Sequence, residues 1–557
     1  MTAASDAAGV EKGGAFAPLA VPIFRRIWTA SLLSNFGQLI LGVGVAWEMT
    51  RLTDDPSMVA LVQTALMLPL MLVAVPAGAI ADMFDRRRVA MTGLAVSVAF
   101  GALLSGLAWA GLATPWMLLA FCSLIGTGVA LYSPSWQASI GEQVPAAQLP
   151  AAVALGTISY NLARSFGPAL GGLIVLAAGA KAAFTINAVC YVPLFLAYLF
   201  WRRQHVPSRL PPERIDRAMV LGARYALFAG SIRTVLTRAF LFGLAGATAS
   251  ALAPLIAKDL LGGDAAIYGV LLGSSGVGAV VGALLINWFR ERFGTEWSTR
   301  LLSVAAGLAL VVVGFSRSVP LTCFALGVAG GANIVTIALF NISVQLSAPR
   351  WVTARALSLF SSALTGGIAI GSWMWGMVAA DWTVGWAIVS SGVLLLAMPL
   401  VAILLPLPEV REEDVALVQL TNTPEVALGL TARSGPVVIE LDYDVDPDDA
   451  REFHGVMLQV QRVRQRNGAF NWSIARDIGD PARWTERYQC RTWGDYLRMR
   501  DRYTQADFAL QERAIALDRT APRSRRIRRM LERPFGSVRW QADSPDPKQE
   551  TVGYIAP

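Results

Sequence analysis

Residues 57–88 read SMVALVQTALMLPLMLVAVPAGAIADMFDRRR, an apolar run that ends in acidic residues and three arginines. The run over 57–80 holds no charged side chain. About 20 such residues in a helix, each rising 1.5 Å, cross the roughly 30 Å of hydrocarbon in a bilayer. The stretch therefore predicts a membrane-spanning helix, followed by a short charged turn at one membrane face.

Runs of the same kind recur along the first 405 residues and predict an all-α membrane fold of twelve transmembrane helices. Short turns separate them, often with proline, glycine or charge. Arg25 and Arg26 precede the first run and no A-x-A-like cleavage site follows it, so we expect it to stay in the mature protein. The twelve runs are 27–48, 57–80, 89–111, 114–137, 150–177, 181–201, 236–257, 266–289, 299–316, 319–343, 354–379 and 382–405.

The composition divides the chain into two unlike parts. Residues 1–405 hold 24 Lys+Arg and 15 Asp+Glu, whereas residues 406–557 hold 23 and 24. Charged residues are thus 39 of 405 in the first part and 47 of 152 in the second, against about 25% in soluble proteins. The composition of the first part is typical of a membrane domain, and that of the second part is typical of a water-soluble domain. Because the basic excess belongs to the membrane part, it gives no indication of a nucleic-acid partner.

Basic residues fall unevenly on the loops between the twelve runs. With the N-terminus in the cytoplasm, the inner loops and flanks hold eighteen Lys and Arg, and the outer loops hold four. Positively charged loops stay inside. We therefore expect a multi-pass protein of the cell (inner) membrane with both termini, and residues 406–557, in the cytoplasm.

The runs divide six and six around a polar connection, and the two halves carry a faint repeat. Gly78 and Arg86 recur as Gly282 and Arg290 at the same offset. Duplicated six-helix halves are a transporter architecture, with the substrate site between them near the middle of the membrane. The expected organisation is an N-terminal cytoplasmic segment (1–22), a first half (23–201), a connecting loop (202–235), a second half (236–405), a linker (406–435), a small cytoplasmic domain (436–545) and a tail (546–557).

The turn after the second run carries a recognisable signature. GAIADMFDRRR at 78–88 resembles the G-x-x-x-D-R-x-G-R-R/K loop of the major facilitator superfamily, with Met83 and Asp85 where the family has Arg and Gly. A carboxylate at the C-terminal end of a helix needs a basic partner. The resemblance implies an ionic latch that gates transport; the alternative is a helix-end charge cluster that only sets topology. The gating candidates here are Gly78, Asp82, Arg86 and Arg87.

The fifth run carries a second signature. NLARSFGPALGG at 161–172 resembles the G-P-x-x-G-G motif of drug antiporters. A proline bends a helix and glycines permit close packing, so Gly167, Pro168, Gly171 and Gly172 are further gating candidates. The sequence around these motifs, including SPSWQ at 133–137, resembles that of the bacterial branch that contains the enterobactin exporter. The resemblance covers residues 20–405.

Polar residues inside the runs are candidates for substrate binding. Arg164 lies about 20 Å into its helix, where a guanidinium costs at least ~2.5–3.5 kcal/mol unless water or a partner receives it. It is predicted to anchor an anionic or phenolic cargo; the alternative is a bridge to Asn161 or to a neighbouring helix. A proton is the candidate coupling ion. Because no Asp or Glu lies in the middle of a run, the sequence offers no clear residue to carry that proton. The other candidates, which line the cavity or bond helices together, are Asn161, Asn35, Gln38, Gln137, Asn333 and Asn341.

The pattern of the C-terminal part predicts a small α+β ferredoxin-like domain. Strands are expected at 437–443, 472–477, 484–490 and 537–542, with helices after Asp446 and from Thr492 to about Ala516. The domain resembles antibiotic-biosynthesis monooxygenase modules, which implies a dimerisation surface. In that module two histidines often stand where this chain has Tyr496 and Arg500, which gives catalysis little support. Trp472 and Trp484 belong to a pocket or to the core.

The leading prediction is a secondary active transporter that exports small amphipathic molecules, drug- or siderophore-like, by alternating access. Its expected partners are the small-molecule cargo and the lipid bilayer; no cofactor and no enzymatic activity are expected. A membrane-tethered enzyme or a sensor, acting through the C-terminal domain, is the alternative. The cysteines and histidines are too widely spaced to suggest a disulfide framework or a metal site; they are Cys122, Cys190, Cys323, Cys490, His205 and His454.

Overall fold

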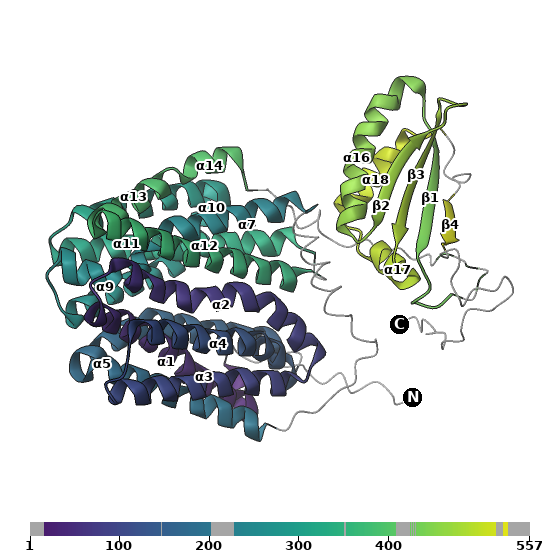
Figure 1. The fold of residues 1–557 in the computed structure, drawn as a ribbon. Coiled ribbons are helices and arrows are strands. Elements are labelled where there is room, and N and C mark those ends of the chain that lie inside the picture. Colours follow the sequence, from purple (N-terminus) through teal and green to yellow (C-terminus); the bar gives the residue numbers. More distant parts are fainter. Residues whose placement is uncertain are drawn as a thin grey trace, which may run out of the picture. The chain divides into compact units, whose positions relative to one another are not determined.

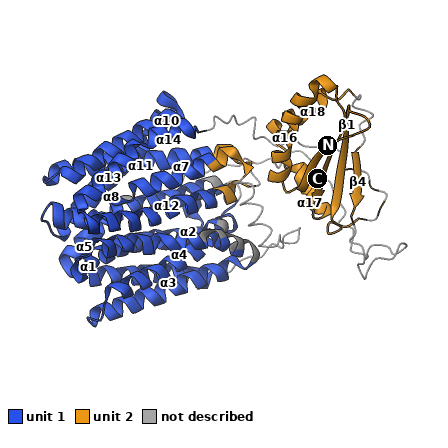
Figure 2. Cartoon of the chain, turned by 45° about the horizontal axis from the view of Figure 1, so that its top comes forward, with its two compact units in different colours: residues 1–219, 234–343, 357–407 blue, residues 220–233, 344–356, 408–557 orange. Residues whose placement is uncertain are grey.

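The chain folds as two compact units (Figure 2). The computed structural model describes residues 16–145, 148–201, 228–349, 352–407, 430–519 and 527–532, together with 424, 426 and 428. One unit is helical and comprises residues 1–219, 234–343 and 357–407. The other comprises the C-terminal domain and two short stretches, 220–233 and 344–356. Most of the predicted connecting loop and linker, and the tail at 546–557, lie outside the described residues.

The helical unit is a bundle of long apolar helices (Figure 1). Ten helical stretches in the described part of the chain are long and apolar enough to cross a membrane. Its elements are η1 (Ala17–Ala20), α1 (Pro22–Leu52), α2 (Pro56–Met83), α3 (Arg86–Trp109), α4 (Pro115–Gln143), α5 (Leu149–Phe200), α7 (Gly230–Gly246), α8 (Thr248–Ala251), α9 (Ala253–Leu255), the π-helical turn η3 (Ile256–Leu260), α10 (Ala265–Phe315), α11 (Val319–Ser347), α12 (Thr353–Asp381), α13 (Val384–Leu396) and α14 (Met398–Leu404).

Local sequence explains where these helices begin and bend. Asp55 and Thr114 accept hydrogen bonds from the first turns of α2 and α4, and each is followed by a proline, which needs no partner for a missing N–H. The run predicted over 236–257 is not one continuous helix, because it breaks into α7, α8, α9 and η3 around Pro254. A proline in a helix removes a hydrogen bond and clashes with the preceding turn.

Two of the helical elements are interrupted at a glycine. α5 has 52 residues and α10 has 51, and each contains one residue outside the helical region. These are Gly179 (φ 76°, ψ 171°) and Gly294 (φ 70°, ψ 172°). Only glycine takes a positive φ at low cost. Both glycines fall where the sequence predicts a turn between two apolar runs.

Glycines form the contact between the first and fifth runs both in residues 23–201 and in residues 236–405. A Cβ on Gly171 of α5 would lie 3.0 Å from the Cβ of Val43 on α1. A Cβ on Gly367 of α12 would lie 2.1 Å from the carbonyl oxygen of Phe240 on α7. The first and fifth runs of one half thus pack as the first and fifth runs of the other do. Small residues at an interface let helix backbones approach closely.

The C-terminal domain is a four-stranded antiparallel sheet in the order β2-β3-β1-β4, with helices against one face (Figure 1). Its core contains Tyr443, Phe453, Met457 and Tyr488. In chain order its elements are β1 (Val437–Asp444), η4 (Pro447–Asp449), α16 (Ala450–Arg466), β2 (Phe470–Arg476), β3 (Arg483–Cys490), α17 (Trp493–Asp501), α18 (Gln505–Ala516) and β4 (Ile527–Leu531).

One prediction for this domain differs from the structure, and another lies outside the described residues. The helix expected from Thr492 to about Ala516 is two helices, because Thr504 and Asp507 form a capping box that starts α18. The fourth strand of the described sheet is β4, whereas the strand expected at 537–542 lies outside the described residues. β4 contains Arg528 and Arg529 and so reads as a basic segment rather than as an apolar strand.

Candidate functional site

A polar stripe runs along the first part of α5. Thr157, Tyr160, Asn161 and Arg164 follow the spacing i, i+3, i+4 and i+7 and therefore share one helix face. Arg164 is half-buried and the other three are exposed. We call these four residues the α5 polar stripe. Polar side chains on a helix of an apolar membrane unit normally face a bundle interior or a water-filled cavity.

The two other faces of this part of α5 are different. One packs on α1: Asn35 Nδ2 donates to Ser159 Oγ (3.3 Å), and Gly167 lies against Leu39. The other is apolar and exposed, with Leu162 and Phe166 suited to lipid. The α5 polar stripe is thus distinct from both the packed face and the lipid-like face of its helix.

The predicted substrate residues are only partly brought together. Asn161 and Arg164 both belong to the stripe. Asn35 on α1 donates a hydrogen bond to Ser159 on α5, so this residue joins two helices, which was the alternative to lining the cavity. Within the described residues, no hydrogen bond joins the Arg164 guanidinium to another side chain and no carboxylate lies within 4 Å of it. The remaining candidates lie elsewhere: Gln38 is half-buried on α1, Gln137 is exposed on α4, and Asn333 and Asn341 are half-buried on α11.

Two close contacts join the halves on the side of the bundle where α2 and α10 begin. A Cβ on Gly172 of α5 would lie 2.3 Å from the Cα of Gly269 on α10. Thr64 of α2 donates its hydroxyl to the carbonyl oxygen of Ala369 on α12 (2.8 Å). The glycines of the G-P-x-x-G-G signature therefore divide: Gly167 and Gly171 face α1, whereas Gly172 faces the other half.

The ends of α1 and η3 carry a further contact between the halves, which sequence reasoning did not find. Trp47 stacks on Tyr268 with ring centroids 5.8 Å apart. Lys258 Nζ donates to the carbonyl oxygen of Thr50 (2.9 Å) and pairs with Asp54 Oδ1 (3.2 Å). We call these five residues the α1–η3 contact cluster. The one indication of this contact in the sequence was that Lys258 and Asp54 stand in turns predicted on the same side of the membrane.

The signature turn between α2 and α3 is held by charges. Gly78 and Asp82 lie in the last turns of α2, and the Asp82 side chain is outside what the structure describes. Arg86 Nη1 donates to Glu142 Oε1 on α4 (3.0 Å). Arg87 donates to the carbonyl oxygens of Tyr198 (2.8 Å) and Leu199 (2.6 Å), and so caps the end of α5.

A second charge cluster lies in the other half and was missed from the sequence. Glu296 on α10 accepts from Arg238 on α7 (2.5 Å) and from Arg300 (2.7 Å), and also from the backbone N–H of Leu407 (3.0 Å). Arg238 is only 3% exposed. The spacing Glu296-Arg300 was a visible local signal, but the partner on α7 is 58 residues away.

The interior of the C-terminal domain holds a buried ion pair. Arg464 Nε donates to Glu486 Oε1 (3.0 Å), and Glu486 also accepts from Tyr443 (3.0 Å) and Trp472 (3.0 Å). Burial alone would raise the pKa of the Glu486 carboxyl, but the charge of Arg464 and these hydrogen bonds lower it below its ordinary value. Trp472 thus belongs to this core network rather than to an open pocket, and Trp484 is buried beside it. No group of three metal-ligating side chains occurs among the described residues.

The chain matches known transporters in sequence and in fold. The family model described as a transmembrane secretion effector matches residues 13–535. The staphyloferrin A transporter of Staphylococcus aureus is 25% identical over 298 residues, 53% of this chain and 74% of that protein. The multidrug efflux pump Tap of Mycobacterium tuberculosis is 25% identical over 411 residues, 70% and 94% of the two chains.

Solved structures agree on the fold. A bacterial homolog of the human lysosomal transporter Spinster superposes with a TM-score of 0.56 at 12% identity, over 70% of this chain and 97% of that one. The apolar helices and their packing match such a transporter, and the family model spans nearly the whole chain. This chain therefore belongs to the transmembrane secretion effectors of the major facilitator superfamily, and it is a multi-pass membrane transporter.

Proposed function

We propose that this transporter exports small amphipathic anions, drug- or siderophore-like, from the cytoplasm by alternating access. The α5 polar stripe is the observation that carries the proposal, because it offers Arg164 near the middle of a helix that also contacts the opposite half. A guanidinium binds carboxylates and phenolates through a planar fork. The named cargo of one relative, staphyloferrin A, and the multidrug efflux of another support the same class of substrate.

The proposal includes twelve membrane crossings with both termini in the cytoplasm. A continuous helix of 51 residues would be about 75 Å long, more than twice the hydrocarbon thickness. α5 and α10 therefore each make two crossings that meet at Gly179 and Gly294. Counted in this way, the ten apolar stretches become twelve. The excess of basic residues on alternate loops supports the orientation.

Alternating access requires that one side closes while the other opens. The α1–η3 contact cluster and the contacts at Gly172 and Thr64 lie in the half of the helices that we place toward the outside. They support a conformation that is closed to the outside. In the proposed cycle these contacts separate to release cargo. The turn at 78–88, through Asp82 and the Arg86–Glu142 pair, favours one of the two states.

The C-terminal domain has the βαββαβ order of the ferredoxin-like plan, which we propose as its fold. The space between its sheet and helices is filled by the network around Glu486, which favours a structural or regulatory role over catalysis. Dimerisation through this domain stays a prediction. The sheet face opposite the helices holds ion pairs of Glu440 with Arg487 (3.7 Å) and Arg528 (3.2 Å). A dimer formed through this charged face is expected to weaken in salt.

Transport into everted membrane vesicles tests the function. The parent should accumulate both a carboxylate-bearing siderophore-like cargo and a neutral hydrophobic cargo of similar size. Arg164→Ala should lower accumulation of the anion about tenfold or more, since a hydrogen bond to a charged group contributes roughly 1.5–3 kcal/mol, while the neutral cargo still passes. Arg164→Lys should lie between. The matched control is Arg317→Ala, at an exposed arginine between α10 and α11.

The outcomes separate the alternatives. If Arg164→Ala transports both cargoes like the parent, the α5 polar stripe is not the substrate site. If removal of residues 408–557 abolishes function while the helical unit remains in the membrane, an enzyme or sensor acting through the C-terminal domain is favoured. Collapse of the proton gradient should stop accumulation if the coupling ion is a proton.

A further inference from the structure

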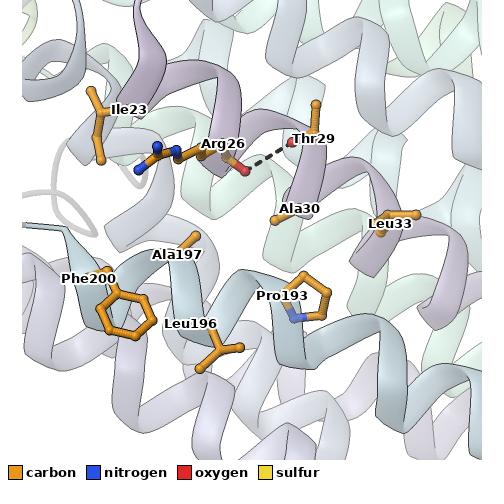
Figure 3. Close-up of a pocket in the computed structure, with 9 residues that line it drawn as sticks. All are labelled: Ile23, Arg26, Thr29, Ala30, Leu33, Pro193, Leu196, Ala197 and Phe200. Atoms are coloured by element: carbon orange, nitrogen blue, oxygen red, sulfur yellow. Dashed lines mark hydrogen bonds between the residues drawn. The ribbon is translucent and has the colours of Figure 1, made fainter.

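A groove lies between the beginning of α1 and the end of α5 (Figure 3). Its volume is about 370 Å³, and side chains of both helices line it. Most of them are apolar, among them Leu33, Leu196 and Phe200. The two polar side chains are Thr29 and Arg26. The Thr29 hydroxyl donates to carbonyl oxygens of its own helix, at Arg25 (2.9 Å) and at Arg26 (3.1 Å). Arg26 is therefore the group that offers polar contact to a ligand.

The positive charge of Arg26 is available to an anion. Its side chain is exposed, and within the described residues no carboxylate lies within 4 Å of it. It stands in the first turns of α1, which begins at Pro22, so the helix dipole adds to the positive potential. Across the groove, two carbonyl oxygens near the end of α5, those of Tyr198 and Leu199, already accept hydrogen bonds from Arg87.

The apolar part of the groove is open to its surroundings. Leu33 is 48% exposed, Leu196 is 40% exposed and Phe200 is 75% exposed. Arg26 and Leu33 are seven residues apart, about 10 Å along α1 by the 1.5 Å rise. A cation thus stands at one end of an apolar channel that runs along a membrane-spanning helix. Arg26 lies near the end of α1 and Leu33 lies deeper, as a lipid headgroup and its chain would.

We propose that this groove binds one anionic phospholipid, with its phosphate on Arg26 and an acyl chain along Leu33, Leu196 and Phe200. Basic pockets between membrane helices suit the headgroups of anionic lipids. The proposed orientation of the chain assigns the lipid to the cytoplasmic leaflet, while the binding itself does not depend on that orientation. The groove is separate from the α5 polar stripe, so lipid binding and cargo binding are tested independently.

Native mass spectrometry of the purified full-length protein tests the site. Phosphatidylglycerol and phosphatidylcholine with identical chains are added in turn. The parent should bind phosphatidylglycerol at least tenfold more tightly. Arg26→Gln should remove this difference. Arg25→Gln is the matched control, because Arg25 is exposed on the same turn but does not line the groove, and it should leave the difference intact. Ala197→Phe, which fills the groove, should weaken the binding of both lipids.

Three results would overturn the proposal. Equal binding of the two lipids by the parent would remove the role of the charge. An equal loss in Arg25→Gln and Arg26→Gln would indicate a general attraction to a basic surface. Displacement of phosphatidylglycerol by inorganic phosphate at similar concentrations would indicate an anion site that needs no acyl chain. Because both arginines are exposed, the variants are expected to fold, and intact mass and monodispersity are checked first.

Discussion

The two predicted halves of the helical unit, residues 23–201 and 236–405, pack alike but carry different charges. In the first half α1 packs on glycines of α5, and in the second half α7 packs on glycines of α12. When Gly167 and Gly171 are aligned with Gly367 and Gly371, Leu364 takes the place of Arg164. The packing surfaces are present twice, whereas the charge in the middle of the helix is present once.

The ends of the halves differ in the same way. The first half holds its signature turn with the Arg86–Glu142 pair, whose side chains are 29% and 22% exposed. The second half buries Arg238, at 3% exposure, against Glu296. A shared fold therefore requires the duplicated glycines, but it does not require duplicated charges. Charges present in one half are where differences of function between the halves are expected.

Glu296→Gln is expected to have the largest effect on stability. It leaves the buried Arg238 without its carboxylate, and breaking a buried ion pair costs about 3–5 kcal/mol. We expect a clear fall in the apparent melting temperature of the detergent-purified protein, measured by intrinsic fluorescence, and a lower yield in the membrane. Glu291→Gln is the matched control, since Glu291 is exposed five residues before Glu296, on the other side of the break at Gly294. If both variants melt like the parent, the cluster around Glu296 does not stabilise the second half.

Gly367→Ala is expected to have an intermediate effect. The added Cβ would meet the Phe240 carbonyl at 2.1 Å, and a backbone atom cannot move aside without shifting its helix. Overpacking of this kind costs about 1–3 kcal/mol. Gly171→Ala should cost less, because its nearest neighbour is the side chain of Val43 at 3.0 Å. The same melting measurement ranks the two variants.

The control for both is Gly106→Ala on α3, where an added Cβ meets nothing within 4 Å. It should be neutral or slightly stabilising, because alanine favours a helix over glycine by roughly 0.5–1 kcal/mol. Equal losses at positions 171 and 367 would mean that the two interfaces are equally tolerant, and the comparison of the halves would then rest on charge alone.

Much of the fold was readable because its signals are local. Apolar runs of helical length located the membrane helices, and the turns expected after residues 177 and 289 contain Gly179 and Gly294. In the C-terminal domain, alternation and turn residues located β1 and β3 to within a residue of their ends. Each of these signals lies within one continuous stretch of the sequence.

The parts that were missed depend on distant partners. Arg238 looked like one basic residue at the edge of an apolar run, and nothing near it indicated Glu296. Arg87 bonds carbonyl oxygens that belong to the end of α5, and a backbone acceptor has no sequence signature. β4 is a strand because it pairs with β1, although two of its five residues are adjacent arginines and its own sequence shows no alternation. The depth of Arg164 in its helix could be predicted from the sequence, and the structure added the exposure of the face that it shares with Thr157, Tyr160 and Asn161.

Glu142→Gln is expected to have the smallest effect on stability, and it separates the two interpretations of the turn at 78–88. The pair with Arg86 is partly exposed, so its loss should cost about 0.2–1 kcal/mol, a small change in melting temperature. If the turn is a latch, the Arg86–Glu142 pair stabilises one state of the transport cycle and is absent from the other. Its loss changes the balance between the two states, so transport into everted vesicles should nevertheless fall several-fold. The double variant Arg86→Gln/Glu142→Gln should then resemble either single variant. If transport is unchanged in all three at equal amounts in the membrane, the charges at this turn set only the topology.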